Sequence, residues 1–189
     1  MRPTSLALLL ASICVPAALA TYSLQTDYSG ANFFEGFDFF TEADPTGGTV
    51  RFVNEAEAND TALAGYLDMG NSQTAIYMAA DSTSKVTDGS GRSSVRVSSN
   101  QVFNHGLFII DIQHMPTGCG TWPAFWLLGP SWPQGGEIDI VEGVNLNTQN
   151  DMTLHTSPGF DISNGGSSGN LTQGLDCNLS SSGNSSEPE

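Results

Sequence analysis

The chain has 189 residues, a length that suits one domain, and its formal net charge is −15. It holds 5 Lys and Arg against 20 Asp and Glu, so it lacks the basic face that nucleic acids and anionic membrane surfaces require. Charged residues make up only 13% of the chain, too few for the solvated faces of long helices. The composition therefore favours an all-β domain of short strands joined by turns.

The first twenty residues predict a secretory signal peptide. Arg2 precedes an apolar run from Leu6 to Leu10, and the segment ends in Ala18-Leu19-Ala20, with small residues where cleavage requires them. The alternative is an N-terminal membrane anchor, but the apolar run is too short to span a bilayer. We therefore expect a secreted, extracellular glycoprotein with no membrane association after cleavage.

Export agrees with four possible N-glycosylation sites, which are Asn59, Asn170, Asn178 and Asn184. Cys14 leaves with the signal peptide, so the mature chain keeps Cys119 and Cys177, an even pair in an oxidising compartment. The sequence alone does not show whether these two form a disulfide.

The mature chain divides at residue 160. Its first part, 21–160, is the expected folded domain, in which an aromatic segment at 21–48 packs against a sheet. Residues 161–189 are rich in Ser, Gly and Asn, bring little to bury, and are expected to form a loop or a disordered tail. No window shows a helical period, and short segments bounded by turn residues are expected strands: 49–53, 74–79, 93–99, 107–113, 124–128, 137–142 and 152–156.

Three carboxylates lie within six residues of the expected strand 137–142, with the spacing E-x-D-x-x-E. Side chains alternate along a strand, so Glu137 and Asp139 share one face, whereas strict alternation sends Glu142 to the apolar face. A β-bulge near Ile140–Val141 would return Glu142 to the first face, because one extra residue shifts the alternation. The carboxyl groups of Glu137 and Glu142 would then stand about 5 Å apart, as in retaining glycosidases.

Two other interpretations of this acidic strand are open at this point: a solvated edge strand, or a Ca²⁺ site built from carboxylates. We expect no required cofactor, and although structural calcium is possible, nothing else in the sequence indicates it. Aromatic neighbours at Trp122, Trp126 and Trp132 favour a sugar site, since their rings offer flat stacking faces, although core packing is the alternative. His155 would reach the carboxylates if its strand pairs with the acidic one.

The segments 114–126, 132–133, 136–145 and 153–156 resemble glycoside hydrolase family 16. Within that family, the resemblance is to secreted fungal-type endo-β-1,3(4)-glucanases (laminarinase-like). Upstream segments at 32–40, 44–46 and 91–96 also match, so the resemblance extends over residues 22–160. It implies a β-jelly-roll sandwich (concanavalin A-like) with a concave glucan cleft. It also implies retaining hydrolysis of internal β-1,3 or β-1,4 bonds in β-glucans.

The resemblance also implies residue roles. Glu137 resembles the nucleophile, Asp139 its helper and Glu142 the general acid/base. Three further residues resemble substrate-binding residues of the cleft: Trp122, Trp126 and His155. We accordingly expect a monomer that acts on a β-glucan polysaccharide.

The sequence departs from the family pattern in two places. Phe160 stands where many relatives have a cysteine, which would leave Cys177 without its usual partner. Relatives also continue with further strands of both sheets, so we expect a sandwich that is incomplete at its C-terminus, with weak activity and poorly cooperative folding of the chain taken alone. Two other functions stay open here: a non-catalytic, truncated glucan-binding remnant, and a transglycosylase in which a sugar hydroxyl replaces water.

Overall fold

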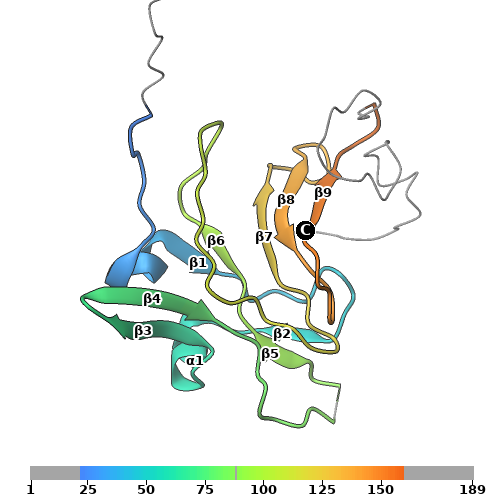
Figure 1. The fold of residues 1–189 in the computed structure, drawn as a ribbon. Coiled ribbons are helices and arrows are strands. Elements are labelled where there is room, and N and C mark those ends of the chain that lie inside the picture. Colours follow the sequence, from blue (N-terminus) through green and yellow to red (C-terminus); the bar gives the residue numbers. More distant parts are fainter. Residues whose placement is uncertain (1–21, 88, 160–189) are drawn as a thin grey trace, which may run out of the picture.

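The structure is a computed structural model that describes residues 22–159 apart from Asp88, and these residues form short strands linked by long loops (Figure 1). The strands are β1 (Phe37–Phe39), β2 (Val50–Phe52), β3 (Ala64–Gly70), β4 (Gln73–Met78), β5 (Arg92–Ser94), β6 (Val97–Ser99), β7 (Ala124–Leu128), β8 (Glu137–Glu142) and β9 (Asp151–His155). The helices are a 3₁₀-helix, η1 (Gly30–Gly36), and one α-helix, α1 (Glu55–Asp60). The all-β prediction is confirmed for the described residues, none of whose helices is long and apolar enough to cross a bilayer.

The strands form four small sheets. β1 pairs with β6 and β3 with β4, both antiparallel, whereas β2 and β5 run parallel. The largest sheet is antiparallel and three-stranded, in the order β7-β8-β9. Figure 1 shows this sheet and the β3–β4 hairpin on opposite sides of the molecule, with β1 and β6 between them. The acidic segment is therefore the central strand of its sheet, with a partner on either side.

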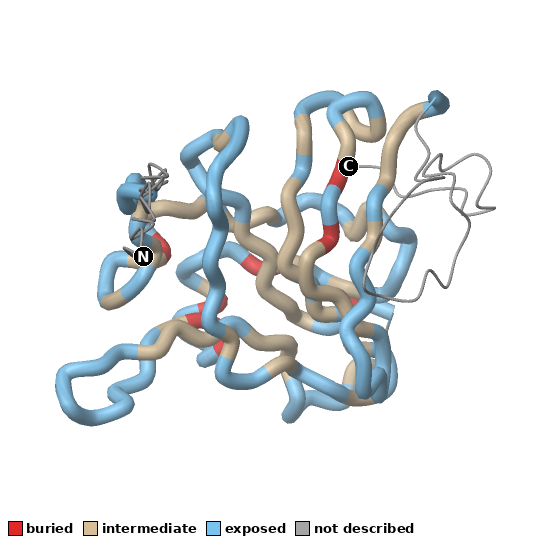
Figure 2. The backbone as a smooth tube through the Cα atoms, turned by 45° about the horizontal axis from the view of Figure 1, so that its top comes forward, coloured by how far each residue is buried: buried red, intermediate tan, exposed pale blue. Residues whose placement is uncertain are grey.

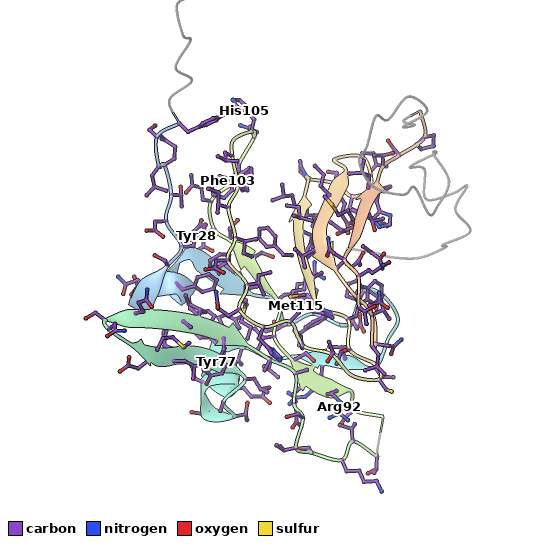
Figure 3. All side chains as sticks on the ribbon, viewed as in Figure 1. Tyr28, Tyr77, Arg92, Phe103, His105 and Met115 are labelled. Carbon is purple, nitrogen blue, oxygen red and sulfur yellow. The ribbon has the colours of Figure 1, made fainter. Side chains whose placement is uncertain are left out.

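Aromatic packing anchors the N-terminal part of the fold. Among the described residues, the buried hydrophobic side chains form one cluster there, which consists of Phe34, Val53, Ala58, Leu63 and Ala64. The ring of Phe34 lies edge-on to Tyr66 of β3, with centroids 5.4 Å apart, so the aromatic segment does pack against a sheet, as predicted. Tyr28 contacts Phe103 in the loop after β6, and His105 lies near the tip of that loop (Figure 3).

Five of the seven expected strands are found within one residue at each end, as β2, β4, β7, β8 and β9. The segment 93–99 divides into β5 and β6 because the chain changes neighbours at Arg96, whose carbonyl accepts a hydrogen bond from Phe40 N–H at 2.9 Å. The expected strand 107–113 was wrong. Its residues have high β propensity, but in the described structure they have no ladder partner, and a strand needs one.

Four elements were not predicted: η1, β1, β3 and α1. The β3–β4 turn is Asn71-Ser72, with φ of 51° and 61°, a two-residue turn that lacks the usual glycine. Helix α1 has six residues, too few for a helical period, and it begins where Asn54 Oδ1 accepts a hydrogen bond from Glu57 N–H at 2.9 Å.

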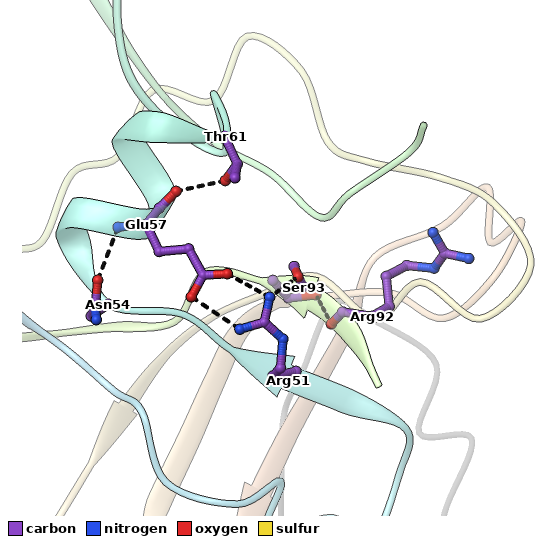
Figure 4. A network of polar contacts seen from close by, with 7 residues as sticks. Arg51, Asn54, Glu57, Thr61, Arg92 and Ser93 are labelled. Atoms are coloured by element: carbon purple, nitrogen blue, oxygen red, sulfur yellow. Dashed lines mark hydrogen bonds and ion pairs between the residues drawn. The ribbon is translucent and has the colours of Figure 1, made fainter. Parts of the chain in front are cut away.

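Glu57 also ties α1 to the sheet beneath it (Figure 4). Its carboxylate accepts two hydrogen bonds from the guanidinium of Arg51 on β2, at 3.0 and 2.5 Å. The same guanidinium donates to Ser93 Oγ on β5 at 2.6 Å. One cation therefore joins the helix to both strands of the parallel pair, and its hydrogen bond lowers the pKa of Glu57.

Several sequence-based expectations lie outside the described residues. They are the signal peptide, the tail at 161–189, Cys177 and three of the four sequons. Cys119 is exposed, and Cys177, the other cysteine of the expected mature chain, lies outside the described residues. The fourth sequon residue, Asn59, is exposed on α1.

Candidate active site

The predicted β-bulge in the acidic strand is confirmed. On one side of β8, Trp126 pairs with Asp139 but Phe125 pairs with Val141, so Ile140 is the extra residue. On the other side, Thr153 pairs with Asp139 and Asp151 with Glu142. Because directly opposed residues point to the same side of a sheet, Glu142 lies on the face that carries Asp139 and Glu137.

The acidic face is the covered face of this sheet, and the apolar face is the more exposed one. Glu137 is 8% exposed and Asp139 3%, whereas Ile138 between them is 46% exposed. Leu154, which pairs with Ile138, is 42% exposed. The hydrophobic pattern of the strand therefore does not mark its buried face. Figure 2 shows that buried positions are few along the described backbone, most of which is intermediate or exposed.

Glu137 is held by an indole from the β7–β8 connection. The Nε1–H of Trp132 donates to Glu137 Oε2 at 2.6 Å. This connection is a tight turn: Gly129 N–H donates to the Gly136 carbonyl at 2.8 Å, and a Cβ on Gly129 would lie 2.1 Å from the carbonyl oxygen of Gly135. Only glycine permits that approach, so the turn returns Trp132 to the start of β8. Sequence reasoning noted Trp132 as an aromatic neighbour but missed its contact with the carboxylate.

Glu142 has a different set of partners. The Nε1–H of Trp122 donates to Oε1 at 2.7 Å, and Thr153 Oγ1 donates to Oε2 at 3.2 Å. The backbone N–H of Glu142 donates to Asn150 Oδ1 at 3.0 Å. Trp122 is itself 50% exposed, so one indole contacts both the carboxylate and solvent. Thr153 and Asn150 were not predicted, because their roles depend on how β9 pairs with β8.

His155 lies where the expected pairing places it, opposite Glu137 in the β8–β9 register. Its Nε2 is 3.5 Å from Asp139 Oδ2, and its side chain is 17% exposed. Ligand atoms of Glu137, Asp139 and His155 all lie within 4.8 Å of one another, a spacing that could hold a metal ion. An imidazole in the set does not suit calcium, which prefers oxygen ligands, and the expectation that no cofactor is required stays a prediction.

Trp126 lies on the acidic face but packs against a cation. The guanidinium carbon of Arg96 is 4.8 Å from the Trp126 ring and 4.3 Å from the Phe40 ring, so the cation lies against both rings. Arg96 belongs to the segment between β5 and β6, and this contact therefore joins the N-terminal part of the fold to the three-stranded sheet. Sequence reasoning predicted Trp126 but not Arg96.

This geometry provides three carboxylates on one face, each with its own partner. Glu137 and Glu142 each accept a hydrogen bond from a tryptophan, and Asp139 between them faces His155. Two carboxylates so arranged across one strand suit attack on, and proton transfer to, a glycosidic bond. The role of each residue stays a prediction.

The sequence and the structure both match known glycoside hydrolases. A family model described as the XgeA-like, catalytic GH16 domain matches residues 37–187. A probable endo-1,3(4)-beta-glucanase of Aspergillus niger is 48% identical over 167 residues, which are 87% of this chain and 22% of that protein. The chain thus spans about a fifth of the length of this curated relative.

Two solved structures are also similar. One is described as an elongating family 16 beta-1,3-glucosyltransferase; it has a TM-score of 0.77 and 39% identity, over 88% of this chain and 55% of that one. The other is laminarinase 16A from Phanerochaete chrysosporium with 6-O-glucosyl-laminaritriose in donor and acceptor sites; its TM-score is 0.71 and its identity 33%, over 86% of this chain and 54% of that one. The described strands are therefore part of a jelly-roll fold, as in these neighbours. By the family model and the relatives, the chain belongs to glycoside hydrolase family 16.

Proposed function

We propose that this site performs retaining endo-hydrolysis of β-1,3 or β-1,4 bonds in β-glucans. The observation that carries the proposal is the bulge in β8, which brings Glu137, Asp139 and Glu142 to one face. An ordinary strand would leave Glu142 on the opposite face, where it could not act on the same bond. Family membership and the glucan-directed names of the relatives support the substrate class.

In the first step, Glu137 attacks the anomeric carbon while Glu142 gives a proton to the departing glycosidic oxygen. A covalent glycosyl–enzyme forms, and the chain fragment beyond the cleaved bond leaves as an alcohol. The indole N–H of Trp132 at 2.6 Å fixes the Glu137 carboxylate before attack. In the second step, Glu142 removes a proton from water, which attacks the same carbon and frees Glu137.

Asp139 and His155 act as supports for the nucleophile in this scheme. Asp139 is the most buried of the three acids, at 3% exposed, and its contact with His155 keeps it in place beside Glu137. Trp122 and Trp126 provide aromatic surface for sugar rings at the rim of the acidic face, and half of Trp122 is open to solvent. Secretion and glycosylation belong to this proposal too, supported by the apolar N-terminal segment and the sequons, and the monomeric state stays a prediction.

The test follows the anomeric configuration of the first product by NMR, with laminarin as substrate and the Glu137→Gln variant as control. We expect a β-anomer that accumulates faster with the wild-type chain than with the variant. An α-anomer formed first would contradict the retaining geometry. Longer glucans without new reducing ends would indicate transfer, the activity named for one structural neighbour. Glucan binding with no difference between wild type and variant would indicate a non-catalytic remnant.

A further inference from the structure

The bulge that brings Glu142 to the other acids also interrupts the hydrogen-bond ladder between β8 and β9. Ile140 and Val141 together face the single residue Met152, so peptide groups at this point of β8 do not meet those of β9 in regular order. Backbone N–H and C=O groups freed in this way need other partners. The geometry of Glu142 therefore depends on what replaces the missing part of the ladder.

Asn150, the residue before β9, provides both replacement partners. Its Oδ1 accepts a hydrogen bond from the backbone N–H of Glu142 at 3.0 Å, and its Nδ2 donates to the backbone carbonyl of Ile140 at 3.0 Å. A side-chain amide offers a donor and an acceptor, as a peptide group does. The Asn150 side chain thus continues the ladder across the bulge where the β9 backbone does not.

These contacts act on the residue that transfers the proton. The Asn150 amide fixes the main chain on both sides of the bulge, which decides the face from which the Glu142 side chain leaves. Trp122 and Thr153 then hold the carboxylate at its two oxygens. We propose that Asn150 is a positioning residue for Glu142, an inference that rests on the proposed function because it concerns proton transfer by that carboxylate.

The same loop contains a matched control. Asn147 is also an exposed asparagine between β8 and β9, and its Nδ2 donates to Asp151 Oδ2 at 3.0 Å. That bond joins side chains and does not contact the bulge. Asn147→Ala therefore removes an amide of the same kind from the same loop and leaves the contacts of Asn150 in place.

The first experiment compares kcat/KM for Asn150→Ala on two β-glucosides, one with a natural sugar leaving group and one with a dinitrophenyl leaving group. The value of kcat/KM on each substrate reports the steps up to formation of the glycosyl–enzyme. We expect a loss of about 10²-fold on the sugar leaving group, as a misplaced catalytic group causes. On the activated substrate we expect little loss, because its leaving group needs no proton. Asn147→Ala should match the wild type on both.

Equal losses on the two substrates would overturn the proposal, because they would indicate a general structural role for Asn150. No loss on either would overturn it as well. Asn150→Asp keeps the acceptor for Glu142 N–H and removes the donor to Ile140, so an intermediate, leaving-group-dependent loss is expected. This variant also carries the test if Asn150→Ala does not fold.

The second experiment needs no turnover and so separates this inference from the proposed function. The indole N–H proton of Trp122 should resonate downfield in the wild-type chain, because it donates to the Glu142 carboxylate at 2.7 Å. In Asn150→Ala we expect this resonance to move toward its position in Glu142→Ala, and in Asn147→Ala to stay in place. An unmoved resonance in Asn150→Ala would refute the positioning role even if no variant hydrolyses glucan.

Discussion

The two parts of the molecule bury opposite kinds of side chain. In the N-terminal part the buried cluster is apolar, and Val53 at 1% exposed is its largest fully buried member. In the β7–β8–β9 sheet the buried side chains are Glu137 and Asp139, while Ile138 and Leu154 are nearly half exposed. The first part is stabilised by removing apolar surface from water, and the second part holds charge away from water.

The comparison shows what burial of carboxylates on a strand requires. A buried carboxylate is unfavourable unless hydrogen bonds replace its water, and in this sheet the donors come from outside β8 itself. Trp132 comes from the β7–β8 turn, and Trp122 from the segment before β7. The acids therefore depend on connections, and on side chains of the neighbouring strand β9, for their geometry. The apolar cluster depends mainly on packing.

The largest effect should come from the acids themselves. Glu142→Gln should lower kcat/KM on laminarin by about 10³-fold, within the range of general acid–base catalysis. Glu137→Gln should lower it further, because it removes the nucleophile of the covalent step. An activated aryl leaving group should restore the glycosylation step of Glu142→Gln but not that of Glu137→Gln. Glu55→Gln, an exposed acid on α1, is the control and should keep wild-type rates. Acids buried for purely structural reasons would show no such dependence on the leaving group.

A smaller effect is expected from the indole donors. Trp132→Phe keeps the ring packing and removes the hydrogen bond to Glu137, which for a charged acceptor contributes about 1.5–3 kcal/mol. We expect kcat/KM to fall by about tenfold or more with either leaving group. Trp122→Phe should instead act through Glu142, so that its loss is larger on the sugar leaving group than on the activated one. The same dependence on the leaving group in both variants would contradict the pairing of Trp132 with Glu137 and of Trp122 with Glu142.

The apolar residues of the two parts should differ in stability. Val53→Ala leaves a cavity in the buried cluster and should lower the free energy of unfolding by about 2 kcal/mol. Leu154→Ala removes a side chain that is 42% exposed and should cost less than about 1 kcal/mol. Denaturant unfolding of both variants measures the difference. Equal costs would mean that Leu154 is covered in solution.

The smallest effect is electrostatic. The hydrogen bond from Arg51 lowers the pKa of Glu57, so the folded chain holds this proton less readily than the unfolded chain does. The resulting stability is present above the ordinary carboxyl pKa of 4.5 and is lost as pH falls through the lowered value. Both side chains are more than a third exposed, so Glu57→Gln should cost about 0.5 kcal/mol at pH 7. In urea titrations this cost should shrink toward zero as pH falls below the lowered pKa of Glu57, and a constant cost would exclude an electrostatic origin.

Sequence alone was sufficient for the features that depend on local alternation. The E-x-D-x-x-E spacing predicted β8 and its bulge, because only an extra residue places three acids so spaced on one face. Turn residues and apolar runs predicted β7 and β9 as well. The resemblance to family 16 rested on the same stretch, and the comparisons confirmed it.

Tertiary structure decided the features that depend on partners distant in the sequence. The segment 107–113 has the composition of a strand, yet it has no neighbour to pair with among the described residues, because pairing is a property of two segments. The contacts of Trp132 with Glu137 and of Asn150 with Glu142 likewise arise only when turns return the chain to β8. The fold also decided which face of that sheet is covered. Alternation places the acidic and the apolar residues on opposite faces, but it does not determine which face the rest of the chain covers.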